Sequence, residues 1–204
     1  MLQALNLSCY RDERVLFKEL TFTLSAGEIM QIEGENGVGK TTLLRLLTGL
    51  SRPDEGSILW NECSILKPCE GWPQQMIYLA HLPGIKQVLT AYENLCFYHP
   101  NATREAIYQA LEEVELTGYE DTPVANFSAG QQRRVALARL WLTDATLWIL
   151  DEPLTAIDKW GVKRLNDKFT EHLAQHGIIV LTTHQDLPES TQPIRKLRLR
   201  GEVE

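Results

Sequence analysis

A short segment rich in glycine, residues 34–41, has the residue types and the spacing of a phosphate-binding loop. It reads Gly-Glu-Asn-Gly-Val-Gly-Lys-Thr and fits the pattern G-x-x-x-x-G-K-[ST]. Glycine lets the backbone bend tightly, so that successive N–H groups point at phosphate oxygens. The sequence predicts a strand before this segment and a helix after it, a context that a chance glycine-rich turn would lack.

We predict that this loop binds ATP together with Mg²⁺. Lys40 is expected to reach the β- and γ-phosphates, and the hydroxyl of Thr41 to ligate Mg²⁺. The helix that begins near Lys40 adds the positive end of its dipole. The residues predicted to contact the nucleotide are Gly34, Glu35, Asn36, Gly37, Val38, Gly39, Lys40, Thr41 and Thr42.

Two neighbouring carboxylates, Asp151 and Glu152, follow the apolar run at residues 147–150. A carboxylate at the end of a central strand lies near the phosphate loop in folds of this type. Asp151 is predicted to hold Mg²⁺, directly or through water, and Glu152 to act as the general base that polarises the attacking water. The alternative is a solvated acidic turn, which the phosphate-binding loop elsewhere in the chain disfavours.

A second apolar run, residues 178–181, leads through two threonines to His184. This histidine is predicted to contact the γ-phosphate, and the alternative is an ordinary surface histidine at the end of a strand. Residues 126–131 precede a basic helix, and Ser128 is predicted to cap it. The N-terminus of that helix would then be a second anion site, or no more than a capped helix end.

The elements that must position these residues indicate an α/β fold with a parallel sheet. Short apolar runs bounded by polar residues are typical of strands buried on both faces, and a helix between two of them is typical of parallel connections. We expect strands at residues 29–32, 56–60, 147–150 and 178–181, and antiparallel strands within residues 5–24. Helices are expected at residues 42–50, 103–116, 130–142 and 162–173.

The first of these helices is expected to bury Leu43, Leu46, Leu47 and Leu50 on one face. Residues 1–204 are predicted to form one domain, in which a helical subdomain at about residues 83–141 is inserted into the α/β core.

Composition narrows the class of protein further. Apolar residues make up 44% of the chain, charged residues 23%, and the net charge is −7, which disfavours binding along a nucleic-acid backbone. No stretch has the roughly 18 apolar residues of a membrane span, and no signal peptide is expected, so we predict a cytoplasmic protein. The cysteines are expected to be buried thiols rather than disulfides or zinc ligands; they are Cys9, Cys63, Cys69 and Cys96.

Taken together, these motifs resemble the nucleotide-binding subunits of ATP-binding cassette (ABC) transporters over essentially the whole chain. The phosphate loop, the segment NFSAGQQ at 126–132, LWILDEP at 147–153, TAID at 155–158 and His184 occur in the order of that family. The resemblance implies a P-loop NTPase fold with a parallel-sheet core, an N-terminal antiparallel β region and a helical subdomain. It also implies ATP hydrolysis.

The resemblance further implies that two copies pair head to tail and sandwich two ATP molecules. Ser128 and Gly130 would contact the γ-phosphate bound to the opposite chain, with Gln131 also at the nucleotide site. Asp158 would lie at the dimer contact. Tyr10 occupies the position where the family commonly stacks an aromatic ring on adenine, and its alternative is an exposed or core tyrosine.

Two positions depart from the family pattern. Ala129 replaces the first glycine of the usual Leu-Ser-Gly-Gly-Gln. We expect the added methyl group to be tolerated and the segment to keep its role. His81 stands where the family has a glutamine that senses Mg²⁺ and couples to the membrane subunit. A neutral imidazole accepts a hydrogen bond from a metal-bound water, so His81 is predicted to belong to the metal site.

A narrower resemblance is to the ATP-binding subunits of bacterial haem-export complexes that serve cytochrome c maturation. The stretches LPGIK, LTAYENLCFYH and GQQRRVALARLWLTDATLWILDEPLTAID carry it. It implies a peripheral protein on the cytoplasmic side of the inner membrane, bound to integral membrane subunits. No haem site is identified, because no C-x-x-C-H spacing is present. ATP hydrolysis would either move haem or release a haem-loaded carrier.

The helical region after His81 is expected to touch the membrane partner. Tyr92, Phe97 and Tyr98 either contribute to that contact or belong to the core of the subdomain. Two other functions remain open at this point. One is the same ATPase serving an exporter of lipids, drugs or another solute. The other is a soluble cassette protein that acts on ribosomes or DNA, which the acidic charge disfavours.

Overall fold

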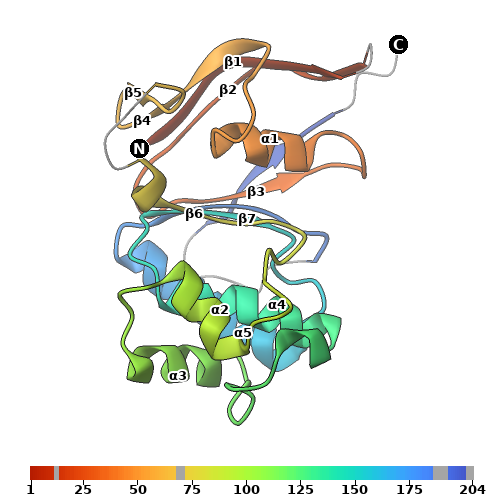
Figure 1. Ribbon diagram of the computed structural model, residues 1–204. Helices are drawn as coiled ribbons and strands as arrows, with labels where there is room; N and C mark the ends of the chain where they lie inside the picture. The colour runs from red at the N-terminus through yellow and green to blue at the C-terminus, as the bar shows by residue number, and fades with distance from the viewer. Residues whose placement is uncertain (12–13, 68–71, 186–192, 201–204) are drawn as a thin grey trace.

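The computed structural model describes residues 1–11, 14–67, 72–185 and 193–200. Two sheets lie on either side of helix α1, and the remaining helices form a further layer below the second sheet (Figure 1). The strands are β1 (Leu2–Arg11), β2 (Arg14–Leu24), β3 (Ile29–Glu33), β4 (Glu55–Trp60), β5 (Cys63–Ser64), β6 (Met76–Leu79), β7 (Leu147–Asp151), β8 (Ile178–Thr182) and β9 (Arg195–Arg198). The helices are α1 (Lys40–Leu47), α2 (Ala91–Tyr98), α3 (Arg104–Glu113), α4 (Ala129–Ala138) and α5 (Lys159–Ala174), with 3₁₀ turns at Trp72–Gln75, Val124–Asn126 and Arg139–Trp141.

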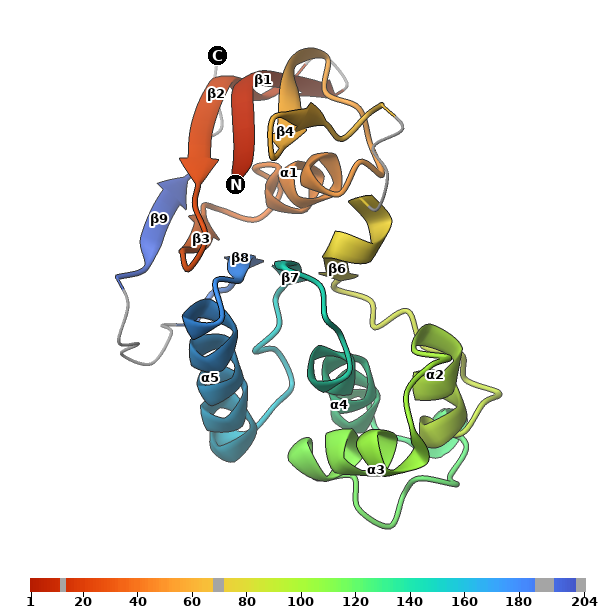
Figure 2. The same cartoon turned by 90° about the vertical axis from the view of Figure 1, so that its left-hand side faces the viewer.

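The first sheet is antiparallel and has the order β2-β1-β4-β5, and the second has the order β6-β7-β8-β3-β9. Every pairing in the second sheet is parallel. The expected antiparallel region and parallel core are therefore confirmed. The helices α2, α3 and α4 lie between β6 and β7 in the chain and are grouped on one side of the second sheet, with α3 farthest from it (Figure 2). The boundaries of a helical subdomain at about residues 83–141 stay a prediction.

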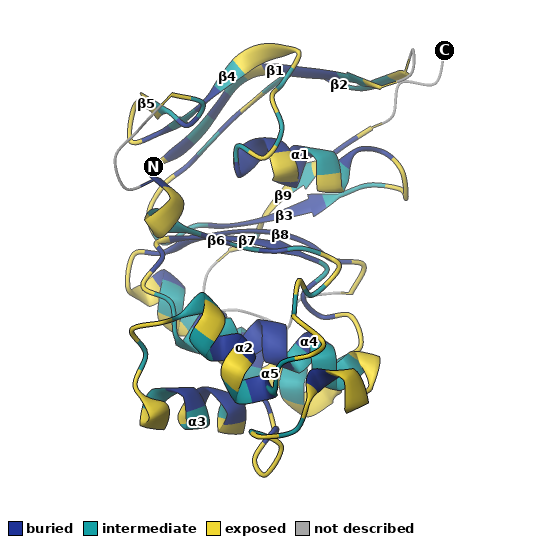
Figure 3. Cartoon of the chain, in the orientation of Figure 1, coloured by how far each residue is buried: buried dark blue, intermediate teal, exposed yellow. Residues whose placement is uncertain are grey.

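The central strands are apolar along their whole length because both of their faces are covered. In β7, Leu147 and Ile149 point to the side of α1, whereas Trp148 and Leu150 point to the side of α4 and α5. This alternation follows from the two-residue period of a strand. Figure 3 shows these strands buried between the two outer layers. The expectation of strands at residues 147–150 and 178–181 is confirmed to within a residue.

One expectation about α1 is wrong. The helix ends at Leu47 and Thr48 caps it, so it does not extend to residue 50. Gly49 follows with φ of 77°, a left-handed conformation that turns the chain away from the helix axis. Leu50 therefore leaves the apolar face and is 63% exposed. Leu43, Leu46 and Leu47 are buried as expected.

The cysteines follow the expectation only in part. Cys9 is buried, Cys96 is half-buried and Cys63 is exposed, and all of these are free thiols. Burial of Cys63 was therefore a wrong expectation, because β5 is a two-residue edge strand with one side open. Cys69 lies outside the described residues. Within the described part of the chain, no helix is long and apolar enough to cross a membrane.

A histidine on α5 is locked into the structure. The ring of His172 stacks on Trp148 with a centroid separation of 3.8 Å and an interplanar angle of 13°. Its Nε2 atom lies 3.1 Å from the carbonyl oxygen of Thr146. Gly177 leaves room for the ring, since a Cβ atom there would lie 2.1 Å from Nε2. Burial lowers the pKa of His172 from 6.5 to about 4.

This shift predicts a stability that depends on pH. The unfolded chain takes up a proton near pH 6.5 and the folded chain only near pH 4, so the stability contributed by neutral His172 is present above pH 6.5 and is lost as the pH falls. After allowance for partial exposure of the ring, we expect this loss to be about 1–2 kcal/mol between pH 7 and pH 4.5.

Urea unfolding at several pH values in this window measures the loss. His172→Gln should show a shallower pH dependence than the wild type. His176→Gln, which changes an exposed histidine on the next turn, should keep the wild-type slope. Both variants retain His99, whose pKa burial also lowers. Equal slopes for His172→Gln and the wild type would contradict the assignment.

Candidate nucleotide-binding site

The phosphate-binding loop joins the end of β3 to the start of α1, as the sequence predicts. Gly34 has φ of 149°, and a Cβ atom there would lie 2.8 Å from both the carbonyl oxygen of Leu199 and Cγ1 of Val38. Gly39 has φ of 108° and stands at the N-terminal cap of α1. Both positions combine a left-handed backbone with close neighbours, so side chains other than glycine would be strained.

Lys40 is the first residue of α1, and its ammonium group folds back over the loop. Nζ donates hydrogen bonds to the carbonyl oxygens of Gly34 at 2.7 Å and Glu35 at 3.0 Å. An ammonium group has three donors, and these two carbonyls take two of them. The arrangement holds the positive charge at the mouth of the loop, where phosphate oxygens of a nucleotide would lie.

Asp151, at the carboxyl end of β7, is oriented by two hydroxyl groups. Thr41 Oγ1 donates to its Oδ2 at 2.9 Å, and Thr182 Oγ1 donates to its Oδ1 at 2.7 Å. The side chain is buried, and Asp151 is paired with Thr182 in the register of β7 and β8. Sequence reasoning missed Thr182, although it is the polar residue that ends the second apolar run.

The chemistry of this pair suits a hard cation. Thr41 and Asp151 present a hydroxyl and a carboxylate oxygen within 2.9 Å of each other on the cavity wall. Mg²⁺ prefers oxygen ligands and usually takes only one or two from the protein, with the rest from phosphates and water. Among the described residues, no group of three or more His, Cys, Asp or Glu side chains could hold a metal ion. A Mg²⁺ ion held by Thr41, Asp151, phosphates and water does not require such a group.

Glu152 follows β7 in a strained conformation, with φ of 52°. Its backbone N–H donates to Thr182 Oγ1 at 2.9 Å, which anchors it beside Asp151. Its Oε1 atom lies 3.5 Å from Nε2 of His184. Oε1 is buried and accepts no hydrogen bond from the described residues, and Glu152 is one of the residues that line the cavity. A carboxylate placed in this way is suited to act as a base.

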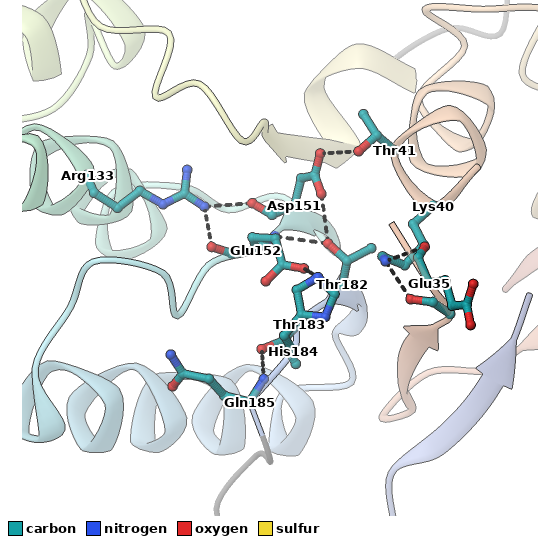
Figure 4. A network of polar contacts seen from close by, with 11 residues as sticks. Glu35, Lys40, Thr41, Arg133, Asp151, Glu152, Thr182, Thr183, His184 and Gln185 are labelled. Atoms are coloured by element: carbon teal, nitrogen blue, oxygen red, sulfur yellow. Dashed lines mark hydrogen bonds and ion pairs between the residues drawn. The ribbon is translucent and has the colours of Figure 1, made fainter. Parts of the chain in front are cut away.

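These groups surround one cavity with a volume of about 460 Å³. The cavity brings together residues that are far apart in the sequence, and Figure 4 shows the polar contacts behind its wall. It is lined by Leu16, Asn36, Gly37, Gly39, Lys40, Thr41, Thr42, His81, Asp151, Glu152, Thr155 and His184. Sequence reasoning missed Leu16, for which no local signal exists, and Thr155, which belongs to the TAID segment.

His81 is exposed, follows β6 and is one of the residues that line the cavity. Its part in a metal site stays a prediction. Tyr10 is not among the lining residues. It lies on β1, where its N–H donates to Asp54 Oδ2 at 2.8 Å. The contact between Tyr10 and adenine therefore also stays a prediction.

The predicted cap of α4 is confirmed. Ser128 Oγ accepts a hydrogen bond from the N–H of Gln131 at 3.2 Å, and the side chain of Gln131 accepts one from the N–H of Ser128 at 3.0 Å. This reciprocal pair is a capping box. Gly130 is close to the carbonyl oxygen of Ala156, which would lie 2.9 Å from an added Cβ atom.

The structure does not bring Ser128, Gly130 and Gln131 to the cavity wall of the same chain. Asp158 lies beside this helix and caps α5, with its Oδ1 accepting from the N–H of Gly161 at 2.8 Å. That hydrogen bond, together with the nearby Arg134, lowers the pKa of Asp158.

Comparison with known proteins agrees with this geometry. The pattern of the family described as ABC transporter matches residues 17–155. The cytochrome c biogenesis ATP-binding export protein CcmA of Tatumella citrea is 59% identical over 202 residues, covering 99% of this chain and 97% of that protein. The protein of the same name from Escherichia coli (strain K12) is 56% identical over 199 residues, covering 98% and 96%.

Solved structures show the same fold. An ABC transporter ATP-binding protein from Pyrococcus furiosus has a TM-score of 0.82 and 25% identity, covering 97% of this chain and 96% of that one. A dimeric ATP-binding cassette in a post-hydrolysis state, bound to ADP and Pi, has a TM-score of 0.79 and 22% identity, covering 91% and 88%. The chain is an ATP-binding, ATP-hydrolysing subunit that belongs to the ABC transporter family, in its group of cytochrome c biogenesis ATP-binding export proteins.

Proposed function

We propose that this chain hydrolyses ATP to drive a membrane complex that exports or delivers haem for the assembly of c-type cytochromes. The observation that carries the proposal is the full-length identity of 54–59% to proteins named for cytochrome c biogenesis and export. The cavity with its phosphate loop and paired carboxylates supports the ATP-dependent part. The proposed location is the cytoplasmic side of the bacterial inner membrane.

The site residues divide the proposed reaction among themselves. The loop N–H groups and Lys40 bind the phosphates, and Thr41 and Asp151 would hold Mg²⁺, which neutralises phosphate charge when bound. Glu152, which lines the cavity, takes the proton of the attacking water. His184, 3.5 Å from Oε1 of Glu152, orients the carboxylate and contacts the γ-phosphate.

A second copy of the chain is part of the proposal. Ser128 and Gly130 stand at the start of α4, outside the cavity of their own chain. In a head-to-tail pair, this helix N-terminus would complete the cavity of the partner and meet the γ-phosphate with its free N–H groups. Each chain would then supply half of two shared sites.

The membrane subunits of the complex are proposed to dock beside the cavity. Leu82 and Val88 are 78% and 87% exposed, and Phe97 on α2 is 56% exposed. Leu82 directly follows His81, which lines the cavity. An integral membrane subunit that covers Leu82 would therefore contact the residue next to His81 of the nucleotide site. Tyr92 is half-buried against the core, and Tyr98 is half-buried with the guanidinium of Arg139 over its ring.

The haem assignment is tested by deleting the gene and staining the cells for covalently bound haem after denaturing electrophoresis. We expect the c-type cytochromes to disappear and to return when the wild-type gene is supplied. A gene encoding Glu152→Gln should fail to restore them, because export depends on hydrolysis. Normal c-type cytochromes in the deletion strain would refute the haem role and favour another exported solute.

A further inference from the structure

Helix α4 carries an arginine, Arg133, that none of the proposed steps uses. Its side chain is only 4% exposed. A buried cation is costly unless its donors are satisfied. Burial lowers the pKa of Arg133, while the charges of Asp151 and Glu152 act in the opposite direction. Its partners therefore explain why an arginine is present at this position.

The guanidinium group donates to backbone carbonyls of two separate loops, and Figure 4 shows its contacts to one of them, at Asp151 and Glu152. Nη1 donates to the carbonyl oxygen of Ala80 at 2.7 Å and lies 3.3 Å from that of His81. Nη2 donates to the carbonyl oxygens of Asp151 at 2.7 Å and Glu152 at 2.9 Å. One side chain thus holds the segments that follow β6 and β7.

These carbonyls lie where the ladder between the two strands ends. The pairing of β6 with β7 ends at Leu79 and Leu150, and the two segments that follow these strands are not paired with each other. A planar guanidinium has two donor edges, so it can lie between the two segments and donate to the carbonyl groups of both, which lie beyond the last pair between β6 and β7. A lysine in this position would have a single ammonium group and would not span both loops.

The contact also acts on the strained residue. Glu152, with φ of 52°, is held on its N–H side by Thr182 and on its carbonyl side by Arg133. Residues in sparsely populated conformations persist only when their surroundings fix them, and they cluster at functional sites. The direction in which the Glu152 carboxylate enters the cavity therefore depends on both contacts.

We propose that Arg133 is a positioning residue that couples α4 to the two cavity loops carrying Glu152 and His81. Because α4 also begins with Ser128 and Gly130, a shift of this helix on meeting a partner would move the base and the His81 loop together. ATP turnover would then respond to the position of the helix. The inference rests on the role proposed for Glu152 as the base.

The test compares ATP turnover of the complex assembled with its membrane subunits and ATP affinity of the isolated chain. For Arg133→Met we expect kcat to fall by about 10- to 100-fold, as for a misplacement of about 1 Å at a reacting group. The dissociation constant for ATP should change by less than about 3-fold, because the phosphate loop is untouched. The kcat of Arg133→Lys should lie between those of the wild type and Arg133→Met. Circular dichroism checks that each variant is folded.

Arg139→Met is the matched control. Arg139 is the C-cap residue of the same helix and is half-buried, but its guanidinium lies 3.9 Å from the ring centroid of Tyr98 and does not line the cavity. Its kcat should stay near the wild-type value. If Arg133→Met behaves like Arg139→Met, or if its loss lies entirely in ATP affinity, the positioning role is wrong.

A double variant separates this inference from the proposed function. In the background of Glu152→Gln, Arg133→Met should lower the residual turnover by less than about 3-fold, since both changes act on the same group. If the turnover of the double variant falls by the product of the two single-variant losses, Arg133 does not act through Glu152. If Glu152→Gln alone turns over ATP at the normal rate, both the assignment of Glu152 as the base and the role of Arg133 are wrong. If Glu152→Gln is slow but Arg133→Met turns over ATP at the normal rate, only the role of Arg133 is wrong.

Discussion

Replacing Glu152 by glutamine is expected to lower ATP turnover by about 10²- to 10⁴-fold, the usual contribution of a general base. Glutamine keeps the size of the side chain and its ability to accept a hydrogen bond, but it cannot take the proton of the attacking water. ATP binding should be unchanged, because the contacts of the phosphate loop and of Asp151 do not involve the Glu152 side chain. Chains trapped as ATP-bound pairs should accumulate.

Release of phosphate by the assembled complex, measured together with ATP affinity, checks this result. Glu171→Gln changes an exposed carboxylate on α5 and is the matched control, with turnover expected at the wild-type level. If Glu152→Gln hydrolyses ATP at the normal rate, Glu152 is not the base. If it loses ATP affinity instead, its role is in binding, and the assignment of Glu152 as the base is wrong.

Replacing Lys40 by alanine should act on the other half of the reaction. We expect ATP affinity to fall by about 10- to 100-fold, since a hydrogen bond to a charged group contributes about 1.5–3 kcal/mol. The same change also removes the two bonds from Nζ to the loop carbonyls of Gly34 and Glu35, so the loop loses its internal tie. Alanine is compatible with the first turn of α1 and should not disturb the helix.

Fluorescence titration with labelled ATP and AMP measures this effect and locates it. Because Lys40 is expected to reach the β- and γ-phosphates, ATP should lose far more affinity than AMP. Lys163→Ala, which removes an exposed lysine from α5, is the control for the loss of charge. Equal losses for ATP and AMP would point to collapse of the loop, and unchanged ATP affinity would remove Lys40 from the site.

The sequence alone determined the phosphate loop, the two carboxylates and the central strands. Each of these is a local pattern: the glycine spacing specifies a backbone path, and the unbroken apolar runs of β7 and β8 specify strands covered on both faces. The cap at Ser128 was also predictable, since Ser128 and Gln131 are three residues apart. The end of α1 was placed three residues too late, because the leucine pattern was followed to Leu50 although Gly49, in a left-handed turn, ends the helix before it.

Tertiary structure alone decided how these pieces meet. Thr41 and Asp151 are 110 residues apart in sequence, and only the parallel sheet brings their oxygens within 2.9 Å. Thr182 acquires its role from its register opposite Asp151. Arg133 looked like one of several basic residues on a helix, because its carbonyl partners come from backbone that carries no sequence signal. Motifs of neighbouring residues can be predicted from the sequence, whereas contacts between distant segments depend on strand register and side-chain packing.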